Sequence, residues 1–192
     1  TLGILGGGQL GKMLLQVTSK LSIKTNILDP NKDSPCKNLC NEFTNGNLMD
    51  FNSVYEFGKK CDIVTFEIEH VNIEALEKLE ADGITVYPRP KTLKIIQDKS
   101  LQKQFFIDNK IPTANFWYFK SFKDFQKSAF KDEISFPCVW KKTKFGYDGY
   151  GVEIIKSSQE IENLPDSEFI IEELIPFKKE LATPYFSLSI IT

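Results

Sequence analysis

Short apolar runs recur along the first 90 residues, separated by segments of a different period. Four runs have the length of buried strands, at 2–5, 25–28, 63–66 and 84–86. Between the first two runs, apolar residues recur at the spacing of a helix: Leu10, Met13, Leu14, Val17 and Leu21. A second helix is predicted from about Asn72, as its N-cap, with one face formed by Ile73, Leu76 and Leu79. This alternation predicts an α/β fold, a Rossmann-like parallel sheet with helices on both sides.

The pattern changes after residues 87–90, Tyr-Pro-Arg-Pro, which we interpret as a joint. Its two prolines extend neither a sheet ladder nor a helix interior. Beyond the joint, the pattern predicts helices over about 100–109 and 122–131. It predicts strands at 115–119, 136–140, 152–155 and 169–173.

Composition and charge exclude several classes of function. A formal net charge of −2 gives no electrostatic case for binding nucleic acid or an anionic membrane. No apolar stretch is long enough to span a bilayer, and the first residues read as a strand rather than a signal peptide. The chain starts without Met, so a few residues are expected to precede Thr1. The scattered cysteines predict free thiols in a cytoplasmic protein: Cys36, Cys40, Cys61 and Cys138.

A basic, glycine-containing segment lies between two of the predicted strands. Lys141, Lys142 and Lys144 stand just before Gly146, Gly149 and Gly151. A strand, a basic glycine loop and a second strand predict a hairpin whose tip covers a polyphosphate. Glycine lets backbone N–H groups approach oxygen atoms, and lysine supplies positive charge. The alternative is a glycine-rich turn with solvated lysines.

The loop after the first strand carries a second glycine motif. Residues 6–11, Gly-Gly-Gly-Gln-Leu-Gly, fit the pattern G-x-G-x-x-G, and Asp29 follows 18 residues after Gly11 at the end of the next strand. This layout is typical of dinucleotide binding and makes an NAD-dependent oxidoreductase an alternative. A helix N-terminus favours any anion, however, and the glycines also suit tight packing of strand against helix.

These loops belong to an ordered set of segments that resembles the ATP-grasp ligases and, within them, the N5-carboxyaminoimidazole ribonucleotide synthase family. The segments are GILGGGQLGKM at 3–13, LDP at 28–30, SPC at 34–36, TFEIEHV at 65–71, YPRP at 87–90, QDKSLQK at 97–103, IPTA at 111–114, FGYDGYG at 145–151 and IIEELIPFKKEL at 170–181. The resemblance implies a pre-ATP-grasp, Rossmann-like substrate domain over 1–90. It implies the first, α+β part of an ATP-grasp nucleotide-binding domain over 91–182.

The resemblance also implies a reaction. ATP phosphorylates bicarbonate to carboxyphosphate, which releases CO₂ in a closed site. The amine of aminoimidazole ribonucleotide captures the CO₂ as N5-carboxyaminoimidazole ribonucleotide, in purine biosynthesis. The implied cofactors are ATP and Mg²⁺, and the implied assembly is a homodimer of the full-length protein. The family's metal carboxylates lie beyond the matching part, so no metal ligand is assigned.

The same resemblance implies roles for individual residues. Aminoimidazole ribonucleotide is expected to contact Gly8, Gln9, Leu10, Glu67 and Glu69. ATP is expected to contact Arg89, Lys141, Lys144, Gly146, Gly149, Gly151, Glu172, Glu173 and Glu180. Tyr147 and Asp148 are expected beside the substrate and carboxyphosphate, as catalytic residues. The role of Lys99, at a basic position of the family, stays open.

Some of these residues also have structural interpretations. Asp148-Gly149 is a favoured hairpin pair, and Glu172-Glu173 fits a solvated strand end. The last segment, 183–192, does not match the family, and much of the family's length is absent. We therefore expect a truncated and inactive piece of the ligase; the alternative is a folded fragment that only binds nucleotide.

Overall fold

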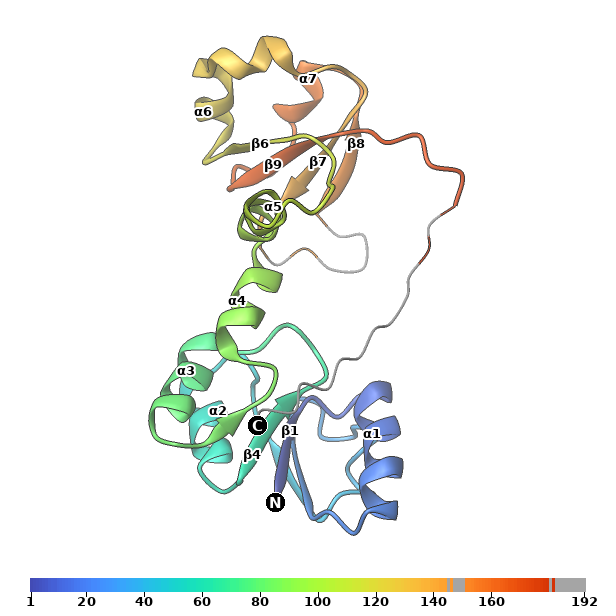
Figure 1. Ribbon diagram of the computed structural model, residues 1–192, viewed down its shortest axis with the longest axis vertical. Helices are drawn as coiled ribbons and strands as arrows, with labels where there is room; N and C mark the ends of the chain where they lie inside the picture. The colour runs from blue at the N-terminus through green and yellow to red at the C-terminus, as the bar shows by residue number, and fades with distance from the viewer. Residues whose placement is uncertain (145, 147–150, 180, 182–192) are drawn as a thin grey trace.

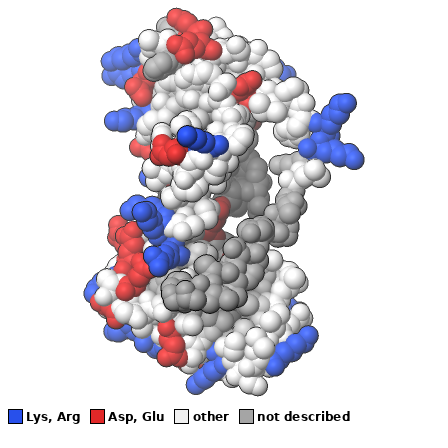
Figure 2. Space-filling model, viewed as in Figure 1, with Lys and Arg blue, Asp and Glu red and all other residues white. Residues whose placement is uncertain are grey.

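The structure, a computed structural model, describes residues 1–144, 146, 151–179 and 181. Two units lie one above the other, joined by α4 (Pro90–Gln97) and α5 (Lys99–Asp108) (Figure 1). Acidic and basic side chains are interspersed on the face shown in Figure 2. Within the described ranges, no helix is long and apolar enough to cross a membrane.

The first unit is a five-stranded parallel sheet in the order β3-β2-β1-β4-β5. Its strands are β1 (Leu2–Leu5), β2 (Thr25–Asp29), β3 (Glu42–Asn45), β4 (Ile63–Phe66) and β5 (Thr85–Val86). Helix α1 (Gln9–Lys20) lies on one side, and α2 (Phe51–Gly58) and α3 (Ile73–Ala81) lie on the other (Figure 1). The predicted Rossmann-like sheet is confirmed.

Two apolar clusters hold this sheet between its helices. Because side chains alternate along a strand, Ile4 packs with Leu15 on the α1 side, whereas Leu5 packs with α2 and α3. The second cluster is larger, and Phe57, Leu76 and Leu79 fill its centre. The Asn72 side chain accepts a hydrogen bond from Ala75 N at 2.8 Å, which confirms the predicted cap of α3.

The second unit is a four-stranded antiparallel sheet in the order β6-β9-β7-β8. Its strands are β6 (Phe116–Phe119), β7 (Cys138–Lys142), β8 (Val152–Ile155) and β9 (Phe169–Glu173). On one side lie α6 (Phe122–Lys127), the 3₁₀ helix (Ala129–Glu133) and α7 (Ser158–Ile161), and on the other lies α5 (Figure 1). Aromatic rings dominate this core, with Trp140 and Phe169 centroids 5.9 Å apart.

Several local predictions were wrong or incomplete. The pattern did not identify β3, α2 or α4. The predicted helix over 122–131 ends at Lys127 and gives way to the 3₁₀ helix. The predicted strand over 136–140 begins only at Cys138, after Pro137, which lacks a ladder donor, and it runs on to Lys142.

The apolar stripe of α1 lies on the outer face of the helix. Leu10, Met13, Val17 and Leu21 are each more than half exposed, at 60%, 54%, 53% and 65%. The buried face is instead formed by Gly11, Leu15 and Thr18. A Cβ on Gly11 would stand 2.9 Å from the Gly6 carbonyl oxygen, so the glycine permits a close approach of helix to loop. The periodicity located the helix but not its buried side.

We predict that three of the four thiols are inert in the folded protein. Burial raises the pKa of all four thiols, to about 11 for Cys36, Cys61 and Cys138, so these three are neutral at pH 8. These three are also buried, whereas Cys40 is half-buried and accessible to a reagent. Iodoacetamide at pH 8 should label Cys40 first, as measured by mass spectrometry of peptides. In urea all four should react. Labelling of Cys138 in the native protein at the same rate as Cys40 would contradict the burial of Cys138 in the core of the second unit.

Candidate functional site

The strand order of the first sheet places a cleft at its carboxyl edge. Successive strands are added on one side of β1 as far as β3 and then on its other side from β4, so the strand order reverses between β1 and β4. In open α/β sheets ligands bind beyond the carboxyl ends of the strands at such a point. The glycine loop follows β1, and residues 67–70 follow β4. An open cavity of about 800 Å³ is lined there by Phe66, Glu67, Ile68, Glu69, His70, Leu93 and Ile96.

Two carboxylates of the protein accept hydrogen bonds from backbone amides of the glycine loop. Gly7 N donates to Asp29 Oδ2 at 2.6 Å, and Gly8 N donates to Glu67 Oε1 at 2.8 Å. Gly6 has φ +99°, and a Cβ there would stand 2.7 Å from Glu67 Cγ. The glycines therefore serve a left-handed turn and a close approach of carboxylates.

This arrangement argues against the dinucleotide alternative. In that layout the loop amides bind a pyrophosphate and the carboxylate after the second strand binds a ribose. Here Asp29 is buried and accepts from Gly7 N and Asn31 N, at 2.6 and 2.7 Å. An incoming pyrophosphate would meet two carboxylates at the loop, which is electrostatically unfavourable.

The other residues predicted to contact the ribonucleotide lie around this loop. Gln9 and Leu10 form the start of α1, and both are exposed. Gly8 occupies the N-cap position without a side-chain cap, so the first turn presents its backbone N–H groups. Glu67 and Glu69 line the same cavity, and Glu69 also lines a second one.

That second cavity, of about 270 Å³, lies between the two units. Its walls include Glu69 and His70 from the first unit and Lys99, Lys144 and Gly146 from the second. The carboxylates after β4 are thus connected, through adjoining cavities, to the base of the basic hairpin.

On the second sheet, one carboxylate lies between two ammonium groups. Glu172 Oε2 is 2.8 Å from Lys141 Nζ, and Glu172 Oε1 is 3.2 Å from Lys103 Nζ. Lys103 Nζ also donates to Thr113 Oγ1 at 2.6 Å. Glu172 is buried, so the interpretation of a solvated strand end is wrong for this residue. Glu173 is exposed and accepts from Asn115 Nδ2 at 3.0 Å.

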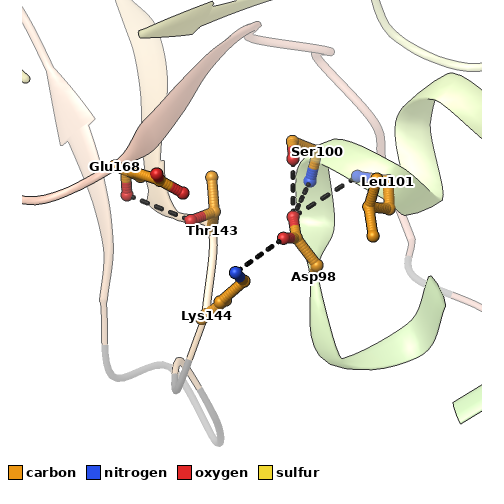
Figure 3. Close-up of polar contacts among 6 residues, drawn as sticks. All are labelled: Asp98, Ser100, Leu101, Thr143, Lys144 and Glu168. Carbon is orange, nitrogen blue, oxygen red and sulfur yellow. Dashed lines mark hydrogen bonds and ion pairs between the residues drawn. The ribbon is translucent and has the colours of Figure 1, made fainter. Parts of the chain in front are cut away.

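The base of the hairpin is fixed to the start of α5 (Figure 3). Asp98 Oδ1 accepts from Ser100 N and Ser100 Oγ at 2.9 and 2.6 Å, so it caps the helix. Asp98 Oδ2 is 3.4 Å from Lys144 Nζ. Lys99 N donates to Thr143 O at 2.8 Å, and Lys99 Nζ donates to Gly146 O at 3.2 Å.

The far end of the hairpin returns to the same base. Lys142 N donates to Gly151 O at 2.9 Å, and Gly151 has φ +73°, a conformation that favours glycine. Tyr147, Asp148 and Gly149, predicted at the tip, lie outside the described residues, as does Glu180.

Arg89 does not lie with the lysines at the base of the hairpin. It is exposed at the N-cap of α4, and that eight-residue helix separates it by about 12 Å of rise from the capped start of α5. Lys99, whose role the sequence left open, is the basic residue that reaches the hairpin.

Two buried residues of the site were missed by sequence reasoning. Asp98 had a usable signal, because an aspartate before a helical segment is a preferred N-cap. Lys103 had none, since a lysine on a helix is usually solvated and its burial depends on a strand almost 70 residues away.

The chain belongs to the family described as the ribonucleotide synthetase preATP-grasp domain, whose model matches residues 1–97. An ATP-grasp domain model matches residues 104–185. The first match ends with α4, and the interval between the two matches, residues 98–103, begins at the cap residue Asp98. The fold and the junction therefore define the ATP-grasp class of proteins.

Two curated relatives match most of this chain but are much longer than it. The chain is 36% identical over 186 residues to the chloroplastic phosphoribosylaminoimidazole carboxylase of Vigna aconitifolia, covering 94% of this chain and 33% of that protein. It is 32% identical over 185 residues to N5-carboxyaminoimidazole ribonucleotide synthase of Synechocystis sp., covering 95% of this chain and 46% of that protein. It thus spans a third to about half of these relatives.

Solved structures of similar proteins match the fold of this chain. Carboxyaminoimidazole ribonucleotide synthase from Aspergillus clavatus complexed with ATP matches with a TM-score of 0.82 and 31% identity, over 92% of this chain and 47% of that one. The same fungal enzyme in complex with ADP and 5-aminoimidazole ribonucleotide matches with a TM-score of 0.79 and 30% identity, over the same shares.

We predict that Asp98 stabilises the junction mainly as a cap. Asp98→Ala should lower the free energy of unfolding by about 1–2 kcal/mol, because the α5 amides lose their acceptor. Asp98→Asn, which retains a capping oxygen, should cost less than half as much, since the half-exposed Lys144 adds little. Urea unfolding followed by tryptophan fluorescence measures both.

Ser157→Ala is the matched control, because Ser157 occupies the N-cap of α7 without a side-chain cap bond, and no change is expected. Equal losses for Asp98→Asn and Asp98→Ala would show that the ion pair, not the cap, carries the effect.

Proposed function

We propose that this chain carries the substrate-binding and first nucleotide-binding parts of an ATP-dependent ligase that converts 5-aminoimidazole ribonucleotide and bicarbonate to N5-carboxyaminoimidazole ribonucleotide, in purine biosynthesis. One observation carries the proposal: the cleft at the sheet's switch point adjoins a cavity whose far wall is the basic hairpin base. The names of the matched relatives and structures support the same reaction.

On the nucleotide side, the donors fit a polyphosphate. Lys141 is the partly exposed member of the Glu172 cluster, and Lys99 and Lys144 stand at the hairpin base. We assign ATP phosphate contacts to these lysines and to Gly146 and Gly151, together with Gly149 from the family resemblance. Glu172, Glu173 and Glu180 are assigned to the adenosine part, where carboxylates accept from amine and hydroxyl groups.

The described residues do not fit Mg²⁺. They contain no group of three or more His, Cys, Asp or Glu side chains arranged to hold a metal ion. Glu172, the carboxylate in contact with Lys141, is already shared by two lysines. We therefore derive no step through the metal from these residues.

On the ribonucleotide side, we assign Gln9 and Leu10 to the phosphate, because the first turn of α1 presents N–H groups and the positive end of the helix dipole. Gly8, whose N–H donates to Glu67, is assigned to the same substrate as the N-cap glycine that precedes this turn. Glu67 and Glu69 are assigned to the amine and hydroxyl groups, since ionised carboxylates are acceptors. The two sets lie on neighbouring strand ends and define one orientation for a ribonucleotide.

The chemistry of this proposal is positioning and exclusion of water. ATP transfers its terminal phosphoryl group to bicarbonate beside the hairpin and leaves as ADP. The carboxyphosphate then splits into CO₂ and inorganic phosphate, and the substrate amine attacks the CO₂ and loses a proton to give the carbamate. Tyr147 and Asp148 are assigned to this step from the family resemblance. Arg89, exposed at the N-cap of α4, is assigned to ATP from the family resemblance alone. A homodimeric assembly and a cytoplasmic location belong to the same proposal; free cysteines support the latter.

A second candidate is a folded fragment that binds nucleotide without turnover. It is favoured by the coverage, because the chain spans only 33% to 46% of the curated relatives described above. Titration with ATP, with and without Mg²⁺, combined with a turnover assay, separates binding from catalysis.

We predict that ADP release requires both substrates and the rest of the relatives' length. The chain alone, and the chain joined to the C-terminal remainder of the Synechocystis synthase, are assayed with ATP, bicarbonate and aminoimidazole ribonucleotide. Only the joined protein should release ADP. The Synechocystis synthase itself controls for the assay, and circular dichroism controls for folding. A folded joined protein without release would contradict the ligase proposal, and a rise in NADH fluorescence with the chain would favour the oxidoreductase instead.

We further predict that Lys141→Met in the joined protein lowers kcat/KM for ATP by at least about 100-fold, because a charge at the transferred phosphates is lost. Lys142→Met, which removes the next lysine of β7, is the matched control and should change it less than about threefold. Equal effects would contradict the placement of Lys141 at the phosphates.

A further inference from the structure

Lys103 is a buried lysine that the proposed chemistry does not use directly. It lies on α5 and is only 9% exposed, and its ammonium group contacts Glu172 at 3.2 Å and Thr113 at 2.6 Å. A lysine this buried requires a charged partner, because the desolvated ammonium is otherwise costly. Glu172 supplies that charge.

The cluster of Glu172, Lys103 and Lys141 has a net positive charge, and its three side chains differ in solvent exposure. One carboxylate faces two ammonium groups, which leaves a formal charge of +1. The side chains of Lys103 and Glu172 are 11% and 7% exposed, whereas that of Lys141 is 27% exposed. The excess charge is therefore accessible only at Lys141.

We infer that Lys103 is a positioning residue that neutralises Glu172 from behind, so that Lys141 keeps its charge for a polyphosphate. The inference rests on the proposed function, since it concerns the same nucleotide site. Without Lys103, Glu172 and Lys141 form a neutral pair, and the carboxylate repels an incoming phosphate. Glu172 holds the Lys141 ammonium in place, and Lys103 prevents that contact from cancelling its charge.

The geometry explains why a second cation is used rather than a neutral hydrogen-bond donor. An amide or hydroxyl in the place of Lys103 would satisfy Glu172 Oε1 but leave its charge uncompensated. Lys103 on α5 and Lys141 on β7 contact Glu172, and Thr113, in the loop before β6, holds the Lys103 ammonium. The arrangement is preorganised before any ligand arrives.

The test is nucleotide affinity as a function of ligand charge, by calorimetry on the chain as it stands. Lys103→Met should weaken ATP binding by about tenfold and ADP binding less, because the charged phosphates respond most to the lost positive charge. Adenosine affinity should change by less than about threefold, since Glu172 keeps Lys141 as its partner. Lys123→Met, at an exposed position on α6, removes the same charge far from the cluster and should have no effect. If Lys103→Met does not fold, Lys103→Gln, which retains a donor, replaces it.

A second comparison separates charge from packing. In the Glu172→Gln background Lys103 has lost its carboxylate partner, and an unpaired ammonium is unfavourable at this buried position. Lys103 then adds little positive charge to the cluster, so adding Lys103→Met should change ATP affinity by less than about twofold. A purely structural role would give the same loss in both backgrounds, and would weaken adenosine as much as ATP.

The affinity measurements test the role of Lys103 separately from the proposed nucleotide site. Unchanged ATP affinity of folded Lys103→Met, or equal losses for ATP and adenosine, overturns the inference while the proposed function stands. If the unsubstituted chain binds neither ATP nor ADP, both the inference and the assignment of this nucleotide site are wrong.

Discussion

The buried carboxylate of Glu172 organises the second unit. Through Lys103 it connects β9 to α5, and through Lys141 it connects β9 to β7. A buried carboxylate without partners would be strongly destabilising, so these contacts are obligatory once β9 is formed. They also fix which face of the sheet can receive an anion. The opposite face is filled by the aromatic core around Trp140 and Phe169.

The position of α5 then determines how the two units face each other. Its first turn is capped by Asp98, and the same residue binds Lys144 at the hairpin base (Figure 3). Because α4 leads directly into this cap, the first unit is attached at the point where the hairpin begins. The cavity between the units follows from that attachment, with carboxylates contributed from one side and lysines from the other.

The sequence predicted what depends on local pattern and failed where contacts are distant. The parallel sheet, the cap at Asn72 and the glycine hairpin's flanking strands were recognisable, because period and capping chemistry are local. The buried side of α1 was not, since Gly11 and Thr18 pack inward where the larger Leu10 and Met13 cannot approach. Lys103 and Glu172 were likewise invisible as a pair, because their burial arises only from sheet assembly.

The glycine loop shows why a motif and its structural context can lead to different conclusions. The spacing of Gly6, Gly8 and Gly11, with Asp29 beyond, is that of a dinucleotide site. Yet the amides that would hold a pyrophosphate are occupied by Asp29 and Glu67. What remains available for an anion is the uncapped first turn of α1, beside carboxylates suited to amine and hydroxyl groups. A mononucleotide with one phosphate and several donors fits that combination of charges, whereas a dinucleotide pyrophosphate does not.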